Sequence, residues 1–399
     1  MNQDFHYYGT YMAALTAGYS NDDSKIIAYA AQYVDDMDIS ILRDVRIANK
    51  TATVQTEAQI LKSSHAEKQN IWPIFHFLPG NVSDITNQKM LDNSQTARKT
   101  FLSKQRNFTK MICLPNSELV FEMINSTKKS FDETNQIKNS IERATSKIQN
   151  LVLVGLRLHI LADTWAHSYF AGIAHSEVND AGNDVYMIDN YEIKRRMRWG
   201  LGGEVSTPAA PSMHAFNYLG HGRMGHLPDY PWIKYEYFPQ WAKEPIVKDN
   251  PSDFLKAFNQ MVDVLVFMRS QETEFRNFNS TPTVAKDKNI RLECENIAKF
   301  IIKTSKPKDV SAKKITEAWR CATLNIGKKV GSNGIDSDSD IATFDKTTWK
   351  NEYMNLNDID KPKSKFYYFV NAAVSQKSLV TKYLIKNGLF LNNKELRRE

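Results

Sequence analysis

Three side chains that can bind a metal follow one another at intervals of four residues within the stretch Leu151–Ala174. This stretch reads LVLVGLRLHILADTWAHSYFAGIA and contains His159, Asp163 and His167. On an α-helix a step of four residues advances the chain by about 400°, so the three side chains spread over roughly 80° of one face. Two imidazoles and a carboxylate on a rigid, apolar helix are a ligand set that suits a divalent metal.

Two other interpretations of this stretch remain open. Its length and apolar character resemble a membrane span, but four ionisable side chains lie near its middle: Arg157, His159, Asp163 and His167. Such groups cost about 2.5 kcal/mol each or more at the centre of a bilayer. Alternatively, a buried helix could hold these groups through mutual hydrogen bonds alone. Because burial without a strong partner is costly, we favour a metal-binding helix.

Further imidazoles and carboxylates occur elsewhere in the chain. They lie at its start, at the end of an expected helix, in an apolar segment and in a glycine-rich loop, and they are Asp4, His6, Asp35, His76, His221, His226 and Asp229. His76 lies in IWPIFHFLPGN, where an imidazole needs partners for both ring nitrogens. Any one carboxylate, taken alone, is more often a solvated surface charge.

Together these candidates predict a multinuclear zinc site. Ten imidazole and carboxylate ligands suit two or three zinc ions that keep positions open for water. The cysteines Cys113, Cys294 and Cys321 are too far apart for a CxxC motif, so they are not expected as ligands. Clustered divalent ions activate water and stabilise charge on entering and leaving oxygens, as phosphodiester hydrolysis requires. Asp163, between two histidines, is placed to bridge two ions.

Five segments, in order along the chain, resemble the bacterial zinc metallophospholipase C family. They are DFH, AAQYVDD, FHFLPG, LHILADTWAHSYFAG and GHGRMGHLPDYPW, and the resemblance covers about residues 1 to 240. The family includes effectors translocated by intracellular pathogens and is related to all-α zinc phospholipases C and single-strand-specific zinc nucleases. The resemblance implies a helical fold and hydrolysis of glycerophospholipids, such as phosphatidylcholine, to diacylglycerol and a phosphorylated headgroup. The implied partner is a phospholipid membrane surface, and no nucleic-acid partner is expected.

The resemblance also implies how the ligands are shared among metal sites. By position, the first site takes Asp35, His76, His159 and Asp163, the second takes His167 and His221 with Asp229 or His226, and a third joins Asp163 to Asp4 or His6. Asp35 and Asp163 are the predicted catalytic residues. Related enzymes use the amine of a mature amino-terminal Trp as a ligand, whereas this chain begins Met1-Asn2-Gln3. We therefore expect a third site to use side chains or to be absent.

The remaining sequence favours helices throughout. DFLKAFNQMVDVLVFMRSQ, ITEAWRCATLNIGKKV and KFYYFVNAAVSQKSLVTKYLI all repeat apolar residues at helical spacing. We predict an all-α protein with a catalytic, metal-binding domain over residues 1–245. A helical, basic region of unknown role follows over residues 246–399 and either packs on the first domain or belongs to it.

Charge and the chain start bear on partners and location. Residues 281 to 399 hold 23 Lys and Arg against 14 Asp and Glu, a surplus that suits anionic lipid or nucleic acid but is also common on a solvated surface. The start shows no basic segment followed by an apolar core, so no conventional signal peptide is expected. The expected location is the cytoplasm of the producing cell, or export by a non-classical secretion system, including export into a host cell.

Two other functions compete with a phospholipase C. One is a zinc nuclease acting on single-stranded nucleic acid, which would place aromatic side chains against bases. The other is a non-catalytic, metal-stabilised helical protein that binds a partner. Aromatic residues that could face either acyl chains or bases are Tyr169, Phe170, Trp199, Tyr230 and Trp232.

Overall fold

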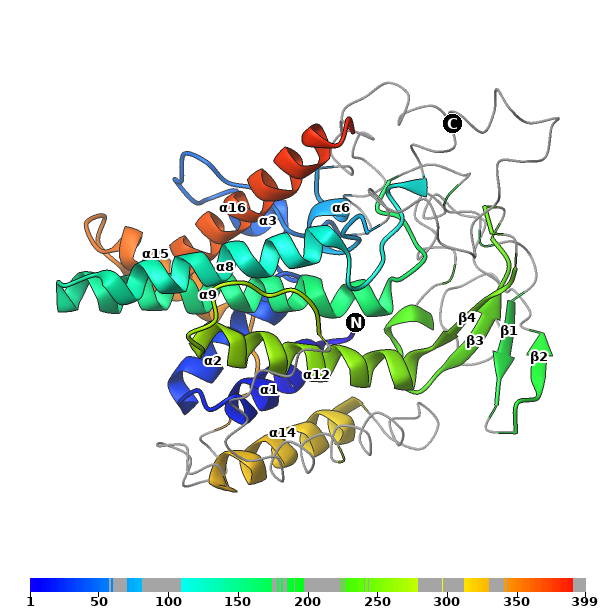
Figure 1. Cartoon of the computed structure of the whole chain (residues 1–399). Helices are drawn as coiled ribbons and strands as arrows, with labels where there is room; N and C mark the ends of the chain where they lie inside the picture. Colours follow the sequence, from blue (N-terminus) through cyan, green and yellow to red (C-terminus); the bar gives the residue numbers. More distant parts are fainter. Residues whose placement is uncertain are drawn as a thin grey trace.

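The structure, a computed structural model, describes residues 1–56, 59, 70–80, 109–173, 178, 181, 185–189, 191–196, 224, 227–239, 241–242, 244–278, 296, 312–329, 341 and 343–389. This part of the chain is mostly helical and contains one small antiparallel sheet. Figure 1 shows the helices grouped around a long central helix, with the sheet at one end of the group.

The central helix is α9 (Ser140–Ala166), which contains the first half of the stretch that carries the predicted ligands. The Asn139 side chain caps its start by accepting hydrogen bonds from the backbone N–H groups of Ile141 and Glu142. From Asn150 onward almost every residue is buried, which confirms that protein surrounds this helix. No helix within the described ranges is long and apolar enough to cross a membrane.

Four long helices pack directly on α9. They are α2 (Asn21–Tyr33), α8 (Glu118–Gln136), α12 (Asn250–Arg269) and α16 (Lys365–Lys386). The approach of α2 is especially close, because a Cβ at Gly155 of α9 would lie 2.3 Å from the Ile27 carbonyl oxygen. The other helices of the described ranges are η1 (Phe5–Gly9), α1 (Thr10–Thr16), α3 (Ile39–Leu42), α6 (Trp72–Phe75), η3 (Leu227–Asp229), α14 (Ala312–Lys329), α15 (Thr348–Asn355) and η5 (Lys361–Lys363).

The sheet has the strand order β2-β1-β3-β4 and is antiparallel throughout. Its strands are β1 (Val185–Ile188), β2 (Lys194–Arg196), β3 (Lys234–Tyr237) and β4 (Ile246–Asp249). The expectation of a purely helical protein missed this sheet. Strands of three or four residues are too short to show a clear alternation of apolar and polar residues. Their pairing also joins segments that are far apart in sequence, which periodicity cannot reveal.

The carboxy-terminal segments contact the same core as the rest of the chain. Both α12 and α16 pack on α9, and their apolar side chains belong to one continuous buried cluster with those of α1, α2 and α9. The boundary expected after residue 245 falls between β3 and β4, which are hydrogen-bonded neighbours. The buried side chain of Gln376 on α16 also accepts a hydrogen bond from Arg157 of α9.

Candidate metal centre

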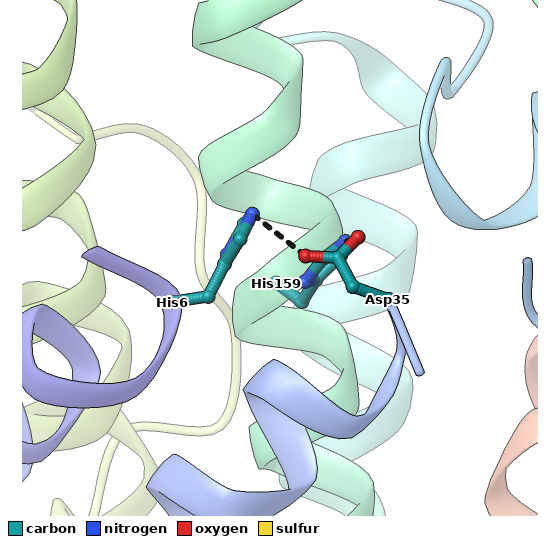
Figure 2. Close-up of side chains that lie close together, drawn as sticks. All are labelled: His6, Asp35 and His159. Atoms are coloured by element: carbon teal, nitrogen blue, oxygen red, sulfur yellow. Dashed lines mark ion pairs between the residues drawn. The ribbon is translucent and has the colours of Figure 1, made fainter. Parts of the chain in front are cut away.

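Histidines and aspartates from four parts of the chain meet beside α9. His6, Asp35 and His159 form one group, and His76, His159 and Asp163 form a second, with the possible ligand atoms of each group within 4.8 Å of one another. His6 comes from η1, Asp35 follows α2, and His76 follows α6. Figure 2 shows the side chains of the first group converging from three separate elements.

Asp163 lies at the middle of this cluster and is only 1% exposed. Its Oδ2 is 3.2 Å from both His76 Nδ1 and His159 Nε2. Its Oδ1 faces the other way, 3.3 Å from His6 Nε2. The two oxygens of one carboxylate thus face separate sets of imidazoles, which is the arrangement expected of a carboxylate that bridges two cations.

Three buried imidazole nitrogens in the cluster make no hydrogen bond to any residue that the structure describes. They are both ring nitrogens of His6 and Nδ1 of His159. The two rings are stacked, with centroids 3.8 Å apart. Leaving a buried polar atom unsatisfied costs about 1–3 kcal/mol. His6 Nε2 lies 3.3 Å from Asp163 Oδ1 without hydrogen-bond geometry, which fits a site that a metal ion completes.

Backbone carbonyls fix the orientation of two further histidines. His76 Nε2 is 2.9 Å from the Thr53 carbonyl oxygen, and His167 Nδ1 is 2.8 Å from the His76 carbonyl oxygen. A carbonyl can only accept, so each of these nitrogens must carry the proton and donate it. When such a ring is neutral, its opposite nitrogen presents a lone pair to the cluster, as metal-binding histidines usually do.

The charges of the cluster are set by burial and by the neighbouring groups. Burial alone would raise the pKa of Asp163, but His167, the Met1 amine and His159 together hold this pKa well below its usual range. Burial, with His159 and the Met1 amine, lowers the pKa of His6 well below its usual value. The centre therefore combines an ionised carboxylate with a neutral imidazole, and both are forms that bind metal.

The amino-terminal amine is a member of the cluster that the sequence analysis missed. The buried nitrogen of Met1 lies 2.7 Å from Asp163 Oδ1 and 3.2 Å from Asp229 Oδ1. Burial lowers the pKa of this amine, but Asp163, Asp229 and Asp35 outweigh it and raise the pKa to about 11. Once deprotonated, the nitrogen offers a lone pair at the same position. Every residue type supplies an α-amine at a chain start, so composition and spacing give no signal for this ligand.

Asp229 and His167 extend the cluster toward η3. His167 Nε2 is 3.2 Å from Asp229 Oδ1. The backbone of η3 is held in place by Asn250, whose side-chain amide donates to the carbonyl oxygens of Leu227 and Tyr230 at 2.7 and 2.9 Å. These two predicted ligands are therefore brought to the centre. His221 and His226 lie outside the described residues.

Asp4 is the one described candidate that lies apart from the centre. Its carboxylate accepts a hydrogen bond from the Thr316 hydroxyl of α14 at 2.6 Å. Two residues along a helix correspond to a rotation of roughly 200°, so Asp4 and His6 cannot face the same side. The sequence left these two as alternatives, and the structure places only His6 at the cluster. The Met1 amine lies on the same side of Asp163 as His6, as a further candidate ligand beside these side chains.

Comparison with known families shows where the chain belongs. It is a member of a family of unknown function, DUF6765, whose model matches residues 1–384. This match includes every described residue of the cluster and continues through α12, α14, α15 and most of α16. No curated protein and no solved structure matches the chain. The family match therefore spans the candidate metal centre and the helices that pack behind it.

Proposed function

We propose that the protein is a zinc-dependent phosphodiester hydrolase, and specifically a phospholipase C that releases the phosphorylated headgroup of glycerophospholipids. The main supporting observation is the buried cluster around Asp163, in which imidazole nitrogens of His6 and His159 face the two oxygens of one carboxylate. The resemblance to zinc metallophospholipases C supports the choice of substrate.

The donor set fits zinc better than it fits calcium or magnesium. Imidazole, carboxylate and amine ligands suit zinc, whereas calcium and magnesium favour sites made mostly of oxygen. His6 and the Met1 amine lie on the Oδ1 side of Asp163, while His76 and His159 lie on the Oδ2 side. Zinc bound here would supply an acidified water molecule and positive charge near the phosphate oxygens.

We infer that substrate approaches the cluster from its exposed edge, at Asp35. The Asp163 side chain is enclosed, whereas the Asp35 side chain keeps 30% of its surface exposed. Asp35 also lies within 3.9 Å of His6, His76 and His159. In our proposal Asp163 holds the centre together, and Asp35 orients the attacking water and accepts its proton.

The candidate aromatic residues leave both substrate classes open. Phe170 is buried and stacks on Tyr237 of β3, so it supports the fold. Tyr230 and Trp232 stack on each other just after Asp229 and are only partly buried. Such a pair can border an acyl chain or a nucleobase. Trp199 lies outside the described residues. Single-stranded nucleic acid is therefore the competing substrate that the experiment must include.

The experiment measures phosphocholine release from phosphatidylcholine micelles by the full chain. We expect release with zinc, and its loss both after chelation and in Asp163→Asn, because the amide is a poor replacement for an anionic ligand. Asp35→Asn should lose most activity, while Asp36→Asn is the matched control, because Asp36 binds the Gln32 side chain instead. A zinc-loaded protein that cleaves single-stranded DNA but no lipid would replace the phospholipase with a nuclease. Firmly bound zinc with neither activity would favour a binding protein.

A further inference from the structure

The β1–β2 hairpin exposes large apolar side chains that the core does not use. Met187, Tyr191 and Ile193 are 37%, 85% and 53% exposed. Tyr191 and Ile193 lie between the two strands, in the turn that joins them. A single exposed apolar side chain is normal, but a group of three within one short hairpin is characteristic of a surface that contacts another molecule.

The second strand of this hairpin is entirely cationic. It consists of Lys194, Arg195 and Arg196, and all three residues are exposed. Lys194 pairs with Glu236, and Arg195 lies 3.6 Å from Asp189. Exposed pairs of this kind are weak and can be exchanged for other anions.

Protection of the sheet edge explains only part of this composition. Because β2 is an edge strand, its charges discourage pairing with another chain. That role accounts for the cations but gives no reason to expose Tyr191 and Ile193 beside them. Tyr and aliphatic side chains flanked by Lys and Arg are the combination that proteins present to the headgroup region of a bilayer.

The hairpin is also tied to the chain segment that carries part of the metal cluster. Lys234, the first residue of β3, pairs with Ile188 of β1, and its ammonium group contacts the Glu192 carboxylate in the turn at 2.7 Å. Asp229, which contacts His167, precedes Lys234 by only five residues. In Figure 1 the amino terminus is drawn near the middle of the molecule, and the sheet lies at its right-hand end.

We propose that the β1–β2 hairpin is a membrane-docking element that inserts its turn among the headgroups of a phospholipid bilayer. Tyr191 and Ile193 enter the boundary between headgroups and acyl chains, and the cations of β2 bind lipid phosphates. Docking in this way brings the metal centre to its substrate. The inference rests on the proposed phospholipase activity, and it adds the surface by which the protein reaches lipid.

The test compares binding and hydrolysis by the zinc-loaded full chain. Binding is measured on ice by sedimentation with vesicles of phosphatidylcholine, with and without phosphatidylglycerol. Hydrolysis is measured on the same vesicles and on monomeric dihexanoyl phosphatidylcholine. The docking variant is Tyr191→Ser with Ile193→Ser. Its matched control is Ile141→Ser, which changes a 79% exposed aliphatic side chain at the start of α9.

We expect the docking variant to lose about tenfold or more in vesicle affinity, because it removes the apolar surface that would be buried. Its vesicle hydrolysis should fall in parallel, while hydrolysis of the monomeric lipid stays within about twofold of wild type, because no monomer needs docking. Arg195→Gln should weaken binding about fivefold, and only to vesicles that contain phosphatidylglycerol. Ile141→Ser should match wild type in every assay.

Each opposing outcome identifies what has failed. Wild-type protein that does not bind vesicles, or a docking variant that binds and hydrolyses them as wild type does, overturns the docking proposal. If the docking variant behaves as wild type and hydrolyses both the vesicles and the monomeric lipid, the proposed phospholipase activity is still supported. Vesicle binding that depends on Tyr191 and Ile193, without hydrolysis of either lipid, would support docking and refute the phospholipase.

Discussion

The pairing of the Met1 amine with Asp163 predicts how the stability of the zinc-free protein depends on pH. The two groups are 2.7 Å apart and both are buried. The neighbouring carboxylates raise the pKa of the amine from 8.0 to about 11. A folded-state pKa above the unfolded value means that protonation stabilises the fold, so this contribution is complete below pH 8 and declines as the pH approaches the folded pKa.

The size of this effect follows from the shift itself. A rise from 8.0 to about 11 corresponds to about 4 kcal/mol in the free energy of unfolding at neutral pH. More than half of it should be lost by pH 10, where the unfolded amine is neutral and the folded amine is still mostly charged. Replacing Asp163 by Asn removes the nearest negative charge and should reduce this dependence.

The assay is urea unfolding of chelator-treated protein at several values between pH 7 and pH 10, comparing wild type with Asp163→Asn. Both proteins share the titrations of their exposed Lys and Tyr residues, so the difference between the two curves isolates the pair. We expect the free energy of unfolding of wild type to fall more steeply over this range. Parallel curves for the two proteins would refute a buried ion pair at the amine.

Three further predictions concern the centre and the helix that carries it. Zinc binding should release protons, because the Met1 amine is protonated at neutral pH and must lose its proton to become a ligand. Calorimetry in buffers of different ionisation enthalpy measures the number of protons released. Zinc uptake without proton release would exclude the amine as a zinc ligand. A Gly-Ser extension before Met1 should lower bound zinc and activity, because it converts the buried amine into an amide, while the same extension at the carboxyl end should leave both unchanged. Gly155→Ala should destabilise the protein by about 1–3 kcal/mol, since the new methyl group would meet the Ile27 carbonyl oxygen. Gly9→Ala is the control in thermal unfolding and should have a smaller effect, because its methyl group would meet only the Phe5 ring at 3.2 Å. Equal effects of the two changes would contradict the close packing of α2 on α9.

The sequence alone predicted that one helix would place several candidate ligands side by side. His159 and Asp163 of α9, with His167 at its end, are adjacent because the helix repeat is a local property of the backbone. The apolar surroundings of His76 likewise indicated a buried imidazole that needed partners. These inferences depend on near neighbours in the chain, and the structure brings all four residues to one centre.

Only the tertiary structure decided which distant groups complete that centre. The choice of His6 over Asp4 depends on which side of η1 faces α9, and the role of Met1 depends on where the chain start is packed. The short sheet that carries the exposed hairpin was likewise invisible to periodicity, because its strands are very short and β1 pairs with β3 across a long stretch of sequence. Such contacts are fixed by the packing of the whole core, so no local pattern of residues could reveal them.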